Sequence, residues 1–358
     1  MNPPIRVLVV DDAVIVRRLI GQALAQVKGF EVVGTASDGD IALAKIEELH
    51  PDAITLDIDM PEMNGLETLR QIRKRWPELA VVMFTGVAEP GVRELEALGL
   101  GANDCITKLP HEGNMVNAIQ WTQARLAPRL KAIVAEGRRV PIVPDEGQRP
   151  IRPAFPDRPF CPEVLAIGAS TGGPNVLEDL IRRLPADFPL PILIVQHMPE
   201  GFTHLLAERL ASRTPFAAEE AKVDSVPVAG KMWVAPGDRH MVVQRLGDSI
   251  TVQTNRELPE NSCRPAVDVL FRSVARVYGS GVLAVVLTGM GQDGLLGAQA
   301  VVKEGGQVLV QDEASSVVWG MPGAVARAGL ASQVLPVAAL AEQIVHRVRA
   351  SKPAAVQA

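Results

Sequence analysis

The sequence predicts an α/β protein with two doubly wound parallel-sheet domains joined by a proline-rich linker. Apolar runs of strand length alternate with segments of helical spacing in residues 5–123, and the alternation resumes at residue 164. Because each βα repeat adds a parallel strand, both regions are expected to form doubly wound sheets. Between them, residues 141–162 hold seven prolines in twenty-two positions. This composition favours an extended connector over a core element.

Composition and charge exclude several classes of protein. The chain has 358 residues, enough for two cores, and its net charge of −5 leaves no basic excess for binding nucleic acid. Residues 5–10 run straight into two aspartates instead of forming a secretory signal, and no apolar run reaches the length of a membrane span. The three cysteines, Cys105, Cys161 and Cys263, lack metal-ligand spacing. These features predict a cytoplasmic protein without membrane insertion.

The first region supplies five short apolar runs that are expected to be strands. They are Ile5–Val10, Glu31–Ala36, Ala53–Asp57, Ala80–Phe84 and Asn103–Thr107. Segments Ala13–Val27 and Gly65–Arg75 between them have helical spacing. In such a sheet the functional edge lies at the carboxyl ends of the strands.

Acidic residues gather at that edge. Asp11 and Asp12 follow the first strand, and Asp57 ends the third. Carboxylates brought together raise one another's pKa unless a cation lies among them, and Mg²⁺ with oxygen ligands is the natural partner. Thr85 and Lys108, after the fourth and fifth strands, would offer a hydroxyl and a positive charge to an anionic group on Asp57. The alternative is a row of solvated loop carboxylates.

Asp11-Asp12, the stretch Leu56–Gly65, Thr85 and Lys108 resemble the receiver domain of two-component response regulators, a flavodoxin-like fold. The resemblance implies that Asp57 accepts a phosphoryl group from a histidine kinase. It also implies that Asp12 and Asp57, with Asp11 close by, form the Mg²⁺ site, and that Thr85 and Lys108 contact the phosphoryl oxygens. Cys105 stands where receivers usually carry an aromatic switch residue, which leaves the route of the signal open.

The second region is organised around Ser170. Val164–Ile167 reads as a strand, residues 168–173 interrupt it with three glycines, and helical spacing resumes after Pro174. A serine in a glycine-flanked strand-to-helix turn matches the G-x-S-x-G pattern of a nucleophile elbow. The N–H groups at the start of the helix suit a developing oxyanion. On this stretch alone, a phosphate-binding turn or a simple connector is the alternative.

The remaining elements follow from the same patterns. Strands are expected at Pro191–Gln196, Gly281–Leu287 and Gln307–Gln311, helices at Phe202–Leu210, Asp268–Tyr278 and Pro336–Arg349, and hairpin strands at Lys231–Ala235 and His240–Thr254 around Arg245–Asp248. Residues 126–140 would extend the last helix of the first region, with Pro128 kinking or restarting it. The predicted division is a receiver at 1–124, a linker at 125–162, a catalytic domain at 163–352 and a tail at 353–358.

His197 and Asp293 also lie just past the carboxyl ends of predicted strands, so both are expected at the same sheet edge as Ser170. A serine becomes a nucleophile when an imidazole takes its proton, and the imidazole needs a carboxylate to fix its tautomer. The chain order Ser, His, Asp differs from the Ser, Asp, His order of α/β-hydrolases. A triad in this chain would therefore stand on another fold.

Other histidines and aspartates compete for these roles. His240, in a loop, is the main alternative base. His204 and His346 fall within helical patterns, and His50 and His111 belong to the first region. Asp238 and Asp268 are alternative acids, although only Asp293 follows a strand within a glycine-rich turn.

Four motifs resemble, in order, the Rossmann-like catalytic domain of the chemotaxis methylesterase (CheB) family: Ile167–Pro174, Gln196–Pro199, Arg264–Asp268 and Thr288–Gly294. The resemblance implies a phosphorylation-regulated protein-glutamate methylesterase that hydrolyses γ-glutamyl methyl esters, releases methanol and deamidates receptor glutamines. Ser170 would be the nucleophile, His197 the general base and acid, and Asp293 the orienting carboxylate. Backbone amides near Thr171 and Met290 would be oxyanion donors. The ester chemistry would need no cofactor.

The resemblance also implies the partners. Methyl-accepting chemoreceptors would be the substrates and a chemotaxis histidine kinase the phosphodonor. The unphosphorylated receiver is expected to cover the esterase pocket, and phosphorylation of Asp57 to release it. Two alternatives stay open: a non-catalytic, phosphate-dependent adaptor of a receptor and kinase array, and the same hydrolase in a non-flagellar chemosensory pathway.

Overall fold

The computed structural model describes residues 3–86, 92–108, 115–137 and 160–350. Contacts divide the chain into two compact units, residues 1–141 and 142–358, and each is described by itself. Of the predicted linker, residues 138–159 lie outside the described residues, as do His111 and the predicted tail. Every helix in the described ranges is too short or too polar to cross a bilayer.

The first unit is built on a five-stranded parallel sheet in the order β2-β1-β3-β4-β5. Its strands are β1 (Ile5–Val10), β2 (Phe30–Ala36), β3 (Ala53–Leu56), β4 (Ala80–Thr85) and β5 (Asp104–Thr107). All residues of β3 and β4 are buried, which explains their continuous apolar sequence. This strand order is the flavodoxin-like one, and the predicted fold class of this region is confirmed.

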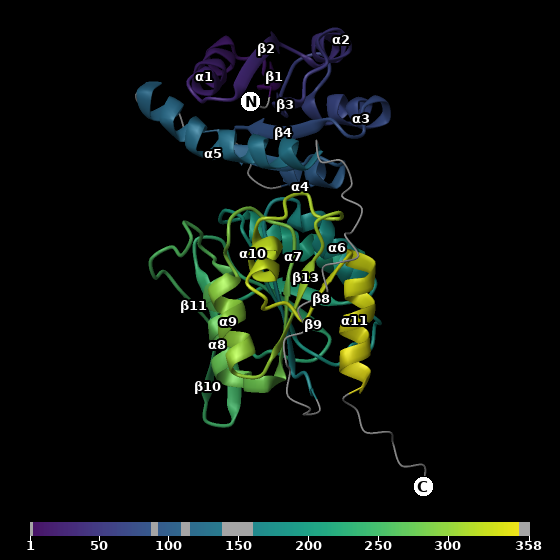
Figure 1. Cartoon of the computed structure of the whole chain (residues 1–358), viewed down its shortest axis with the longest axis vertical. Coiled ribbons are helices and arrows are strands. Elements are labelled where there is room, and N and C mark those ends of the chain that lie inside the picture. The colour runs from purple at the N-terminus through teal and green to yellow at the C-terminus, as the bar shows by residue number, and fades with distance from the viewer. Residues whose placement is uncertain (1–2, 87–91, 109–114, 138–159, 351–358) are drawn as a thin grey trace. The chain divides into compact units, whose positions relative to one another are not determined.

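Five helices accompany this sheet: α1 (Val14–Ala25), α2 (Gly39–Leu49), α3 (Gly65–Arg75), α4 (Val92–Gly99) and α5 (Met115–Gly137) (Figure 1). Side chains at the helix starts fix two of them: Asp38 accepts from the N–H of Ile41, and Asn64 accepts from that of Glu67. Gln123 of α5 donates to the Ala23 carbonyl of α1 at 3.1 Å, which joins these two helices in one layer.

Helix α5 decides between the two outcomes predicted for Pro128, a kink or a restart. The structure has one element that includes Pro128 and runs to Gly137, so a restart of the helix is wrong, and a kink stays a prediction. The predicted apolar side of this segment is buried, at Leu126, Leu130, Ile133 and Val134. Proline has no N–H, so the helix lacks one backbone hydrogen bond at Pro128. Burial of the apolar side compensates for this loss and keeps the helix continuous.

The second unit holds a seven-stranded sheet in the order β14-β13-β12-β6-β7-β9-β8, with every neighbouring pair parallel. The strands are β6 (Val164–Ala169), β7 (Ile192–Gln196), β8 (Ala217–Glu220), β9 (Lys231–Val234), β12 (Val282–Val286), β13 (Gln307–Gln311) and β14 (Gln333–Leu335). The prediction that Lys231–Ala235 is hairpin material was wrong. Lys231–Val234 pairs in parallel with β7 and β8, because its buried Met232 and Trp233 belong between two helix layers.

Helices cover both faces of this sheet (Figure 1): α6 (Gly173–Arg182), α7 (Phe202–Arg213), α8 (Val267–Tyr278), α9 (Leu295–Lys303), α10 (Met321–Arg327) and α11 (Val337–Ala350). Alternate residues of the inner strands enter two separate apolar cores. Leu165 and Ile167 pack in the core that includes α6, α7 and α11, whereas Val164 and Ala166 pack in the core that includes α8, α9 and α10. A strand buried on both faces is therefore apolar throughout.

The predicted hairpin is formed by β10 (His240–Leu246) and β11 (Ser249–Asn255), which pair antiparallel around Gly247 and Asp248. Gly247 has a φ of +59°, a backbone conformation that favours glycine. The N–H of Val243 donates to Ser273 Oγ of α8 at 3.1 Å, so the hairpin packs against that helix.

Candidate active site

Ser170 lies in the turn between β6 and α6, the strand-to-helix context expected of a nucleophile elbow. Gly172 precedes the helix with a φ of +78°, in the left-handed region. The N–H of Ser170 donates to the Thr288 carbonyl at 3.0 Å, and the Ser170 carbonyl accepts from Gly173 N–H and from Gln196 Nε2, both at 2.8 Å. The serine backbone is therefore held from neighbouring strands as well as from its own helix.

Close packing leaves no room for larger residues around this turn. A Cβ at Gly289 would come within 2.8 Å of Ser170 Cβ and 2.3 Å of Met321 Sδ. A Cβ at Gly173 would meet Gln196 Oε1 at 2.0 Å. Two of the glycines in the sequence motifs therefore serve the close approach of neighbouring segments to Ser170.

The three predicted catalytic side chains come from three adjacent strands. Ser170 follows β6, His197 follows β7 and Asp293 follows β12, and β6 lies between the other two in the sheet. Chain connections run outward from β6 in both directions, so this edge is the topological switch point where α/β sheets place their ligands. Sequence distance between these residues is large, but their strands are neighbours about 5 Å apart.

His197 and Asp293 are joined by a hydrogen bond of 2.7 Å between Nε2 and Oδ2. Asp293 is 2 % exposed, so its charge depends on protein donors. Oδ2 also accepts from the N–H of Val267, and Oδ1 accepts from the N–H groups of Asp268 and Gly294. Val267 and Asp268 are the first residues of α8, whose positive end stabilises an anion.

These contacts shift the pKa values of the pair in opposite directions. Burial alone would raise the pKa of Asp293, but the hydrogen bond and charge of His197 and the two α8 N–H groups hold it below its usual range. Burial alone would lower the pKa of His197, yet hydrogen bonds to Asp293 and to Cys263 raise it to about 9. The pair is built to hold an imidazolium beside a carboxylate.

The competing histidines have other surroundings. His240 is fully buried and both its nitrogens are used, because Nδ1 accepts from Ala266 N–H and Nε2 bonds the Leu258 carbonyl. His204 is exposed on α7 beside Glu208. His50 ends α2 in a left-handed conformation. His240 therefore supports the fold, and His204 lies on the surface.

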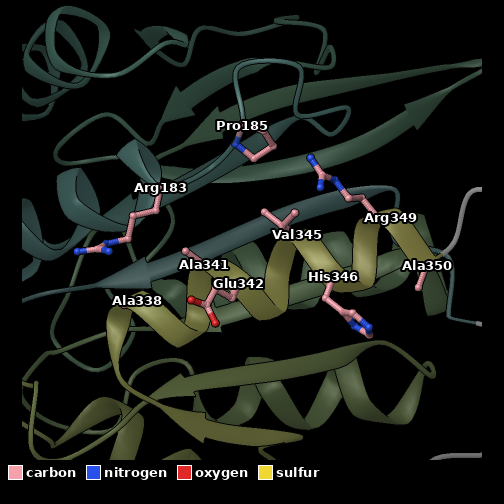
Figure 2. Close-up of a pocket in the computed structure, with 9 residues that line it drawn as sticks. All are labelled: Arg183, Pro185, Ala338, Ala341, Glu342, Val345, His346, Arg349 and Ala350. Atoms are coloured by element: carbon pink, nitrogen blue, oxygen red, sulfur yellow. The ribbon is translucent and has the colours of Figure 1, made fainter.

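His346 lines a groove of about 890 Å³ between α11 and the segment that follows α6 (Figure 2). Arg183 and Pro185 form the opposite wall of this groove. Helix α6 starts beside Ser170 and ends at Arg182, so the groove lies one helix length away from Ser170. The groove is therefore separate from the candidate active site.

The competing acids lie near the site but are not bonded to His197. Asp268 on α8 accepts from Gly297 N–H and shares the side chain of Asn261 with Asp293. Burial, together with the charge of Asp293, raises the pKa of Asp268 to about 6. Asp238 pairs instead with Arg264 at 2.5 Å. Sequence reasoning did not find Asn261 or the α8 amides, although the Arg264–Asp268 motif contains the start of that helix.

The two predicted oxyanion residues flank Ser170 from different segments. Thr171 is buried in the turn after Ser170, and its carbonyl accepts from Thr288 Oγ1 at 2.9 Å. Met290 is 36 % exposed in the loop after β12. Their role as oxyanion donors stays a prediction.

In the first unit, the three aspartates predicted to form the acidic site lie close together. Ligand atoms of Asp11, Asp12 and Asp57 lie within 4.8 Å of one another. Lys108 Nζ lies 2.7 Å from a carboxylate oxygen of Asp11 and 2.7 Å from one of Asp57. Thr85 is buried at the end of β4, and its carbonyl accepts from the Lys108 N–H at 2.6 Å. All five predicted residues thus lie at one edge of the sheet.

Three carboxylates with hard oxygen donors fit Mg²⁺, which accepts a few protein ligands and keeps several waters. Burial raises the pKa of Asp57 to about 6 and also raises that of Asp11, with Lys108 opposing both shifts. A divalent cation among these carboxylates would remove this cost. The residues present therefore fit the metal expected at a receiver site.

Mg²⁺ binding is expected to weaken as the pH falls through about 6. A raised pKa means that Asp57 takes up a proton in this range, and a protonated carboxyl is a poor ligand. Calorimetric titration should give affinity about tenfold lower at pH 5 than at pH 8. Asp57→Asn should weaken this dependence, which Asp11 would still contribute to, and Asp59→Asn, at an exposed carboxylate, should keep it in full. Equal affinity of the natural protein at both pH values would contradict the assignment.

Cys105 occupies the position of the usual aromatic switch residue. Its thiol lies 3.5 Å from the Glu94 carbonyl of α4, and burial raises its pKa well above the usual value. The side chain is therefore a neutral contact between β5 and α4.

Two classes of site thus occur in one chain. The first unit carries the acidic pocket typical of phosphoaccepting receivers, and the second places Ser170 at the same sheet edge as a hydrogen-bonded His197–Asp293 pair, the residue types that serine hydrolases use. The chain belongs to the CheB methylesterase family. That family matches residues 165–344, and the response regulator receiver domain matches residues 7–120.

Relatives extend this match over nearly the whole chain. The protein-glutamate methylesterase/protein-glutamine glutaminase of Trichodesmium erythraeum is 49% identical over 353 residues, which cover 97% of this chain and 99% of that protein. The protein of the same name from a Nocardioides species is 42% identical and covers 99% of each. The crystal structure of the Thermotoga maritima CheB methylesterase catalytic domain is 39% identical, with a TM-score of 0.51 over 52% of this chain and 98% of that one. The predicted family and fold class are confirmed, and the predicted activity agrees with the names of these relatives.

Proposed function

We propose that this chain performs the reaction of its family with Ser170 as nucleophile, His197 as general base and acid, and Asp293 as the orienting carboxylate. The activity is that of a protein-glutamate methylesterase and protein-glutamine glutaminase with a receiver domain. The proposed substrates are γ-glutamyl methyl esters, and glutamines, on chemoreceptors. The ester chemistry is proposed to need no cofactor.

The hydrogen bond between His197 Nε2 and Asp293 Oδ2 carries this proposal. Because the carboxylate accepts a hydrogen bond from the Nε2–H group, the neutral imidazole keeps its proton on Nε2 and presents Nδ1 as its basic nitrogen. Backbone N–H groups at the start of α8 hold the Asp293 carboxylate in place, and the carboxylate in turn fixes the orientation of the His197 ring. Ser170 is the residue after β6, and His197 is the residue after β7. The two are neighbours across the sheet edge, because the last residues of these strands are register partners.

The steps follow from this arrangement. Ser170 Oγ attacks the ester carbonyl while Nδ1 of His197 takes the hydroxyl proton. The proton passes to the methoxy oxygen as the carbon–oxygen bond breaks, which releases methanol and leaves an acyl-enzyme. Water then attacks with His197 again as base, and free Ser170 is restored. With a glutamine, ammonia leaves in place of methanol. N–H groups near Thr171 and Met290 are proposed to bind the oxyanion.

The first unit is proposed to control this reaction through phosphorylation of Asp57 by a chemotaxis histidine kinase. Asp11, Asp12 and Asp57 would hold Mg²⁺, and Thr85 and Lys108 would contact the phosphoryl oxygens. When bound, the metal would neutralise charge on the phosphoryl oxygens. Phosphorylation adds about −1.5 to −2 charges. Because Lys108 pairs with both Asp11 and Asp57 in the unmodified protein, its pairing must change, and this starts the signal.

The proposed division of the chain keeps the predicted boundaries: a receiver at 1–124, a linker at 125–162, a catalytic domain at 163–352 and a tail at 353–358. Family matches at 7–120 and 165–344 support the two domains. A cytoplasmic location is proposed with them, where a kinase and the signalling helices of receptors would be accessible.

Methanol release from methylated chemoreceptor membranes, with and without a small-molecule phosphodonor, tests the function. We expect release that rises on phosphorylation, and we expect Asp57→Asn to lose the rise but keep the basal rate. Methanol release at the same rate with and without the phosphodonor would refute regulation by phosphorylation. No release in either state, with Asp57 shown to be phosphorylated, would refute the esterase and favour a non-catalytic adaptor.

A further inference from the structure

His197 has a second partner that the proposed reaction does not use. Its Nδ1 lies 3.4 Å from Cys263 Sγ, while Nε2 is bonded to Asp293. Both ring nitrogens are thus engaged, and in the described part of the chain the partner of Nδ1 is a thiol rather than Ser170 Oγ. This nitrogen is the one that must take the proton of Ser170.

We propose that Cys263 is a fourth functional side chain of the esterase site, which shares Nδ1 of His197 with Ser170 and restrains the general base in the resting enzyme. The proposal rests on the function proposed above. The contact occupies Nδ1, so Cys263 must move away from this nitrogen before Nδ1 can take the proton of Ser170.

The turn that carries Cys263 is built to hold it there. Glu260 and Cys263 exchange two backbone hydrogen bonds, of 3.1 and 2.8 Å. Asn261 and Ser262 between them have φ values of +50° and +61°, conformations that cost free energy for residues other than glycine. Asn261 Nδ2 donates to Asp293 Oδ1 at 3.1 Å, so the turn is tied to the carboxylate that holds His197.

The segment after Cys263 is anchored as well. Arg264 Nε donates to Asp238 at 3.0 Å, and its Nη1 donates to the Glu257 carbonyl at 3.0 Å. The Arg264 guanidinium thus fixes the chain on the side of Cys263 that faces α8. The Cys263 thiol itself contacts the His197 imidazole. Anchors on both sides of Cys263 make the contact a feature of the fold rather than of a loose loop.

The charged surroundings of His197 explain the effect on the base. Asp293 faces Nε2 from the loop after β12, and Cys263 faces Nδ1 from the turn before α8. Asp268 of α8 is the next group, linked to Asp293 through Asn261. Against the opposing effect of burial, Asp293 and Cys263 raise the pKa of His197 to about 9. At pH 7 about 1% of such an imidazole is neutral and able to accept a proton.

Removal of Cys263 should therefore free the base at neutral pH. In Cys263→Ala, the midpoint of the pH profile of kcat/KM should fall from about 9 toward 6.5, and each unit of this shift raises the rate at pH 7 about tenfold. Cys263→Ser, which keeps a hydrogen-bonding group at this position but removes the sulfur, should also lower the midpoint. Cys161→Ala, at an exposed thiol, is the matched control and should change neither quantity.

A second readout needs no substrate. In full-length protein labelled with ¹⁵N-histidine, titration of the His197 ring by NMR should show the same lower midpoint in Cys263→Ala as in the activity profile. An unchanged midpoint in both Cys263 variants would overturn the proposal, and so would a lower rate with an unchanged midpoint, the sign of structural support alone. If the natural protein releases no methanol, the proposed function fails, and the NMR midpoint still decides the role of Cys263.

Discussion

Ser170→Ala is expected to lower methanol release from methylated receptors by about 10⁴-fold or more, with the fold unchanged. The hydroxyl makes the new bond to the acyl group, and neither His197 nor Asp293 supplies another nucleophile. Alanine fits the turn, because the hydrogen bonds that hold residue 170 use its backbone. Initial rates at saturating receptor, together with the melting temperature, measure both expectations.

A covalent serine probe gives an independent check of this result. A fluorophosphonate should label the natural protein at Ser170 and leave Ser170→Ala unlabelled. Ser212→Ala, at an exposed serine on α7 whose hydroxyl donates to the Arg209 carbonyl, serves as the matched control and should keep full activity. Methanol release at a normal rate from Ser170→Ala would rule out the serine mechanism.

Asp293→Asn is expected to cost about 10³- to 10⁴-fold in kcat, with less effect on KM. The carboxylate accepts from the N–H groups of Val267, Asp268 and Gly294 and from His197. An amide has one oxygen for these donors, and its NH₂ group would face either the α8 amides or the imidazole N–H. The ring would then lose the tautomer that presents Nδ1 to Ser170.

The pH profile separates this role from simple support of the fold. Asp293 is one of the two groups that raise the pKa of His197 to about 9, so the midpoint of activity should fall in the variant even as the maximal rate collapses. Asp248→Asn, at the exposed tip of the hairpin, is the control and should keep both rate and midpoint. Full activity in Asp293→Asn would show that another acid orients His197.

Many of the elements could be predicted because their patterns are local. Ile5–Val10, Gly65–Arg75 and Gln307–Gln311 begin and end where the sequence indicated. Buried strands read as continuous apolar runs, and amphipathic helices show their period. The strands that were missed, β8 and β14, lie at the two edges of the sheet and have no fully buried residue, so they lack the continuous apolar run of a central strand.

Errors arose where packing against distant segments decides the structure. Nothing local in Lys231–Val234 distinguishes a hairpin strand from an internal parallel one. Pro128 argues for a break when taken by itself, yet the buried side of α5 keeps the helix continuous. In both cases burial in a core outweighs a local preference.

By itself, the sequence determined that Ser170, His197, Asp293 and Asp57 stand at the carboxyl ends of strands, since short βα repeats allow few other arrangements. Only the tertiary structure decided which ring nitrogen of His197 meets Asp293, and that Cys263 meets the other. It also decided that the start of α8 holds Asp293. These contacts join segments 25 or more residues apart, and a hydrogen bond between side chains requires both in register to within a fraction of an ångström. Periodicity places residues on faces and edges, but packing alone sets such distances.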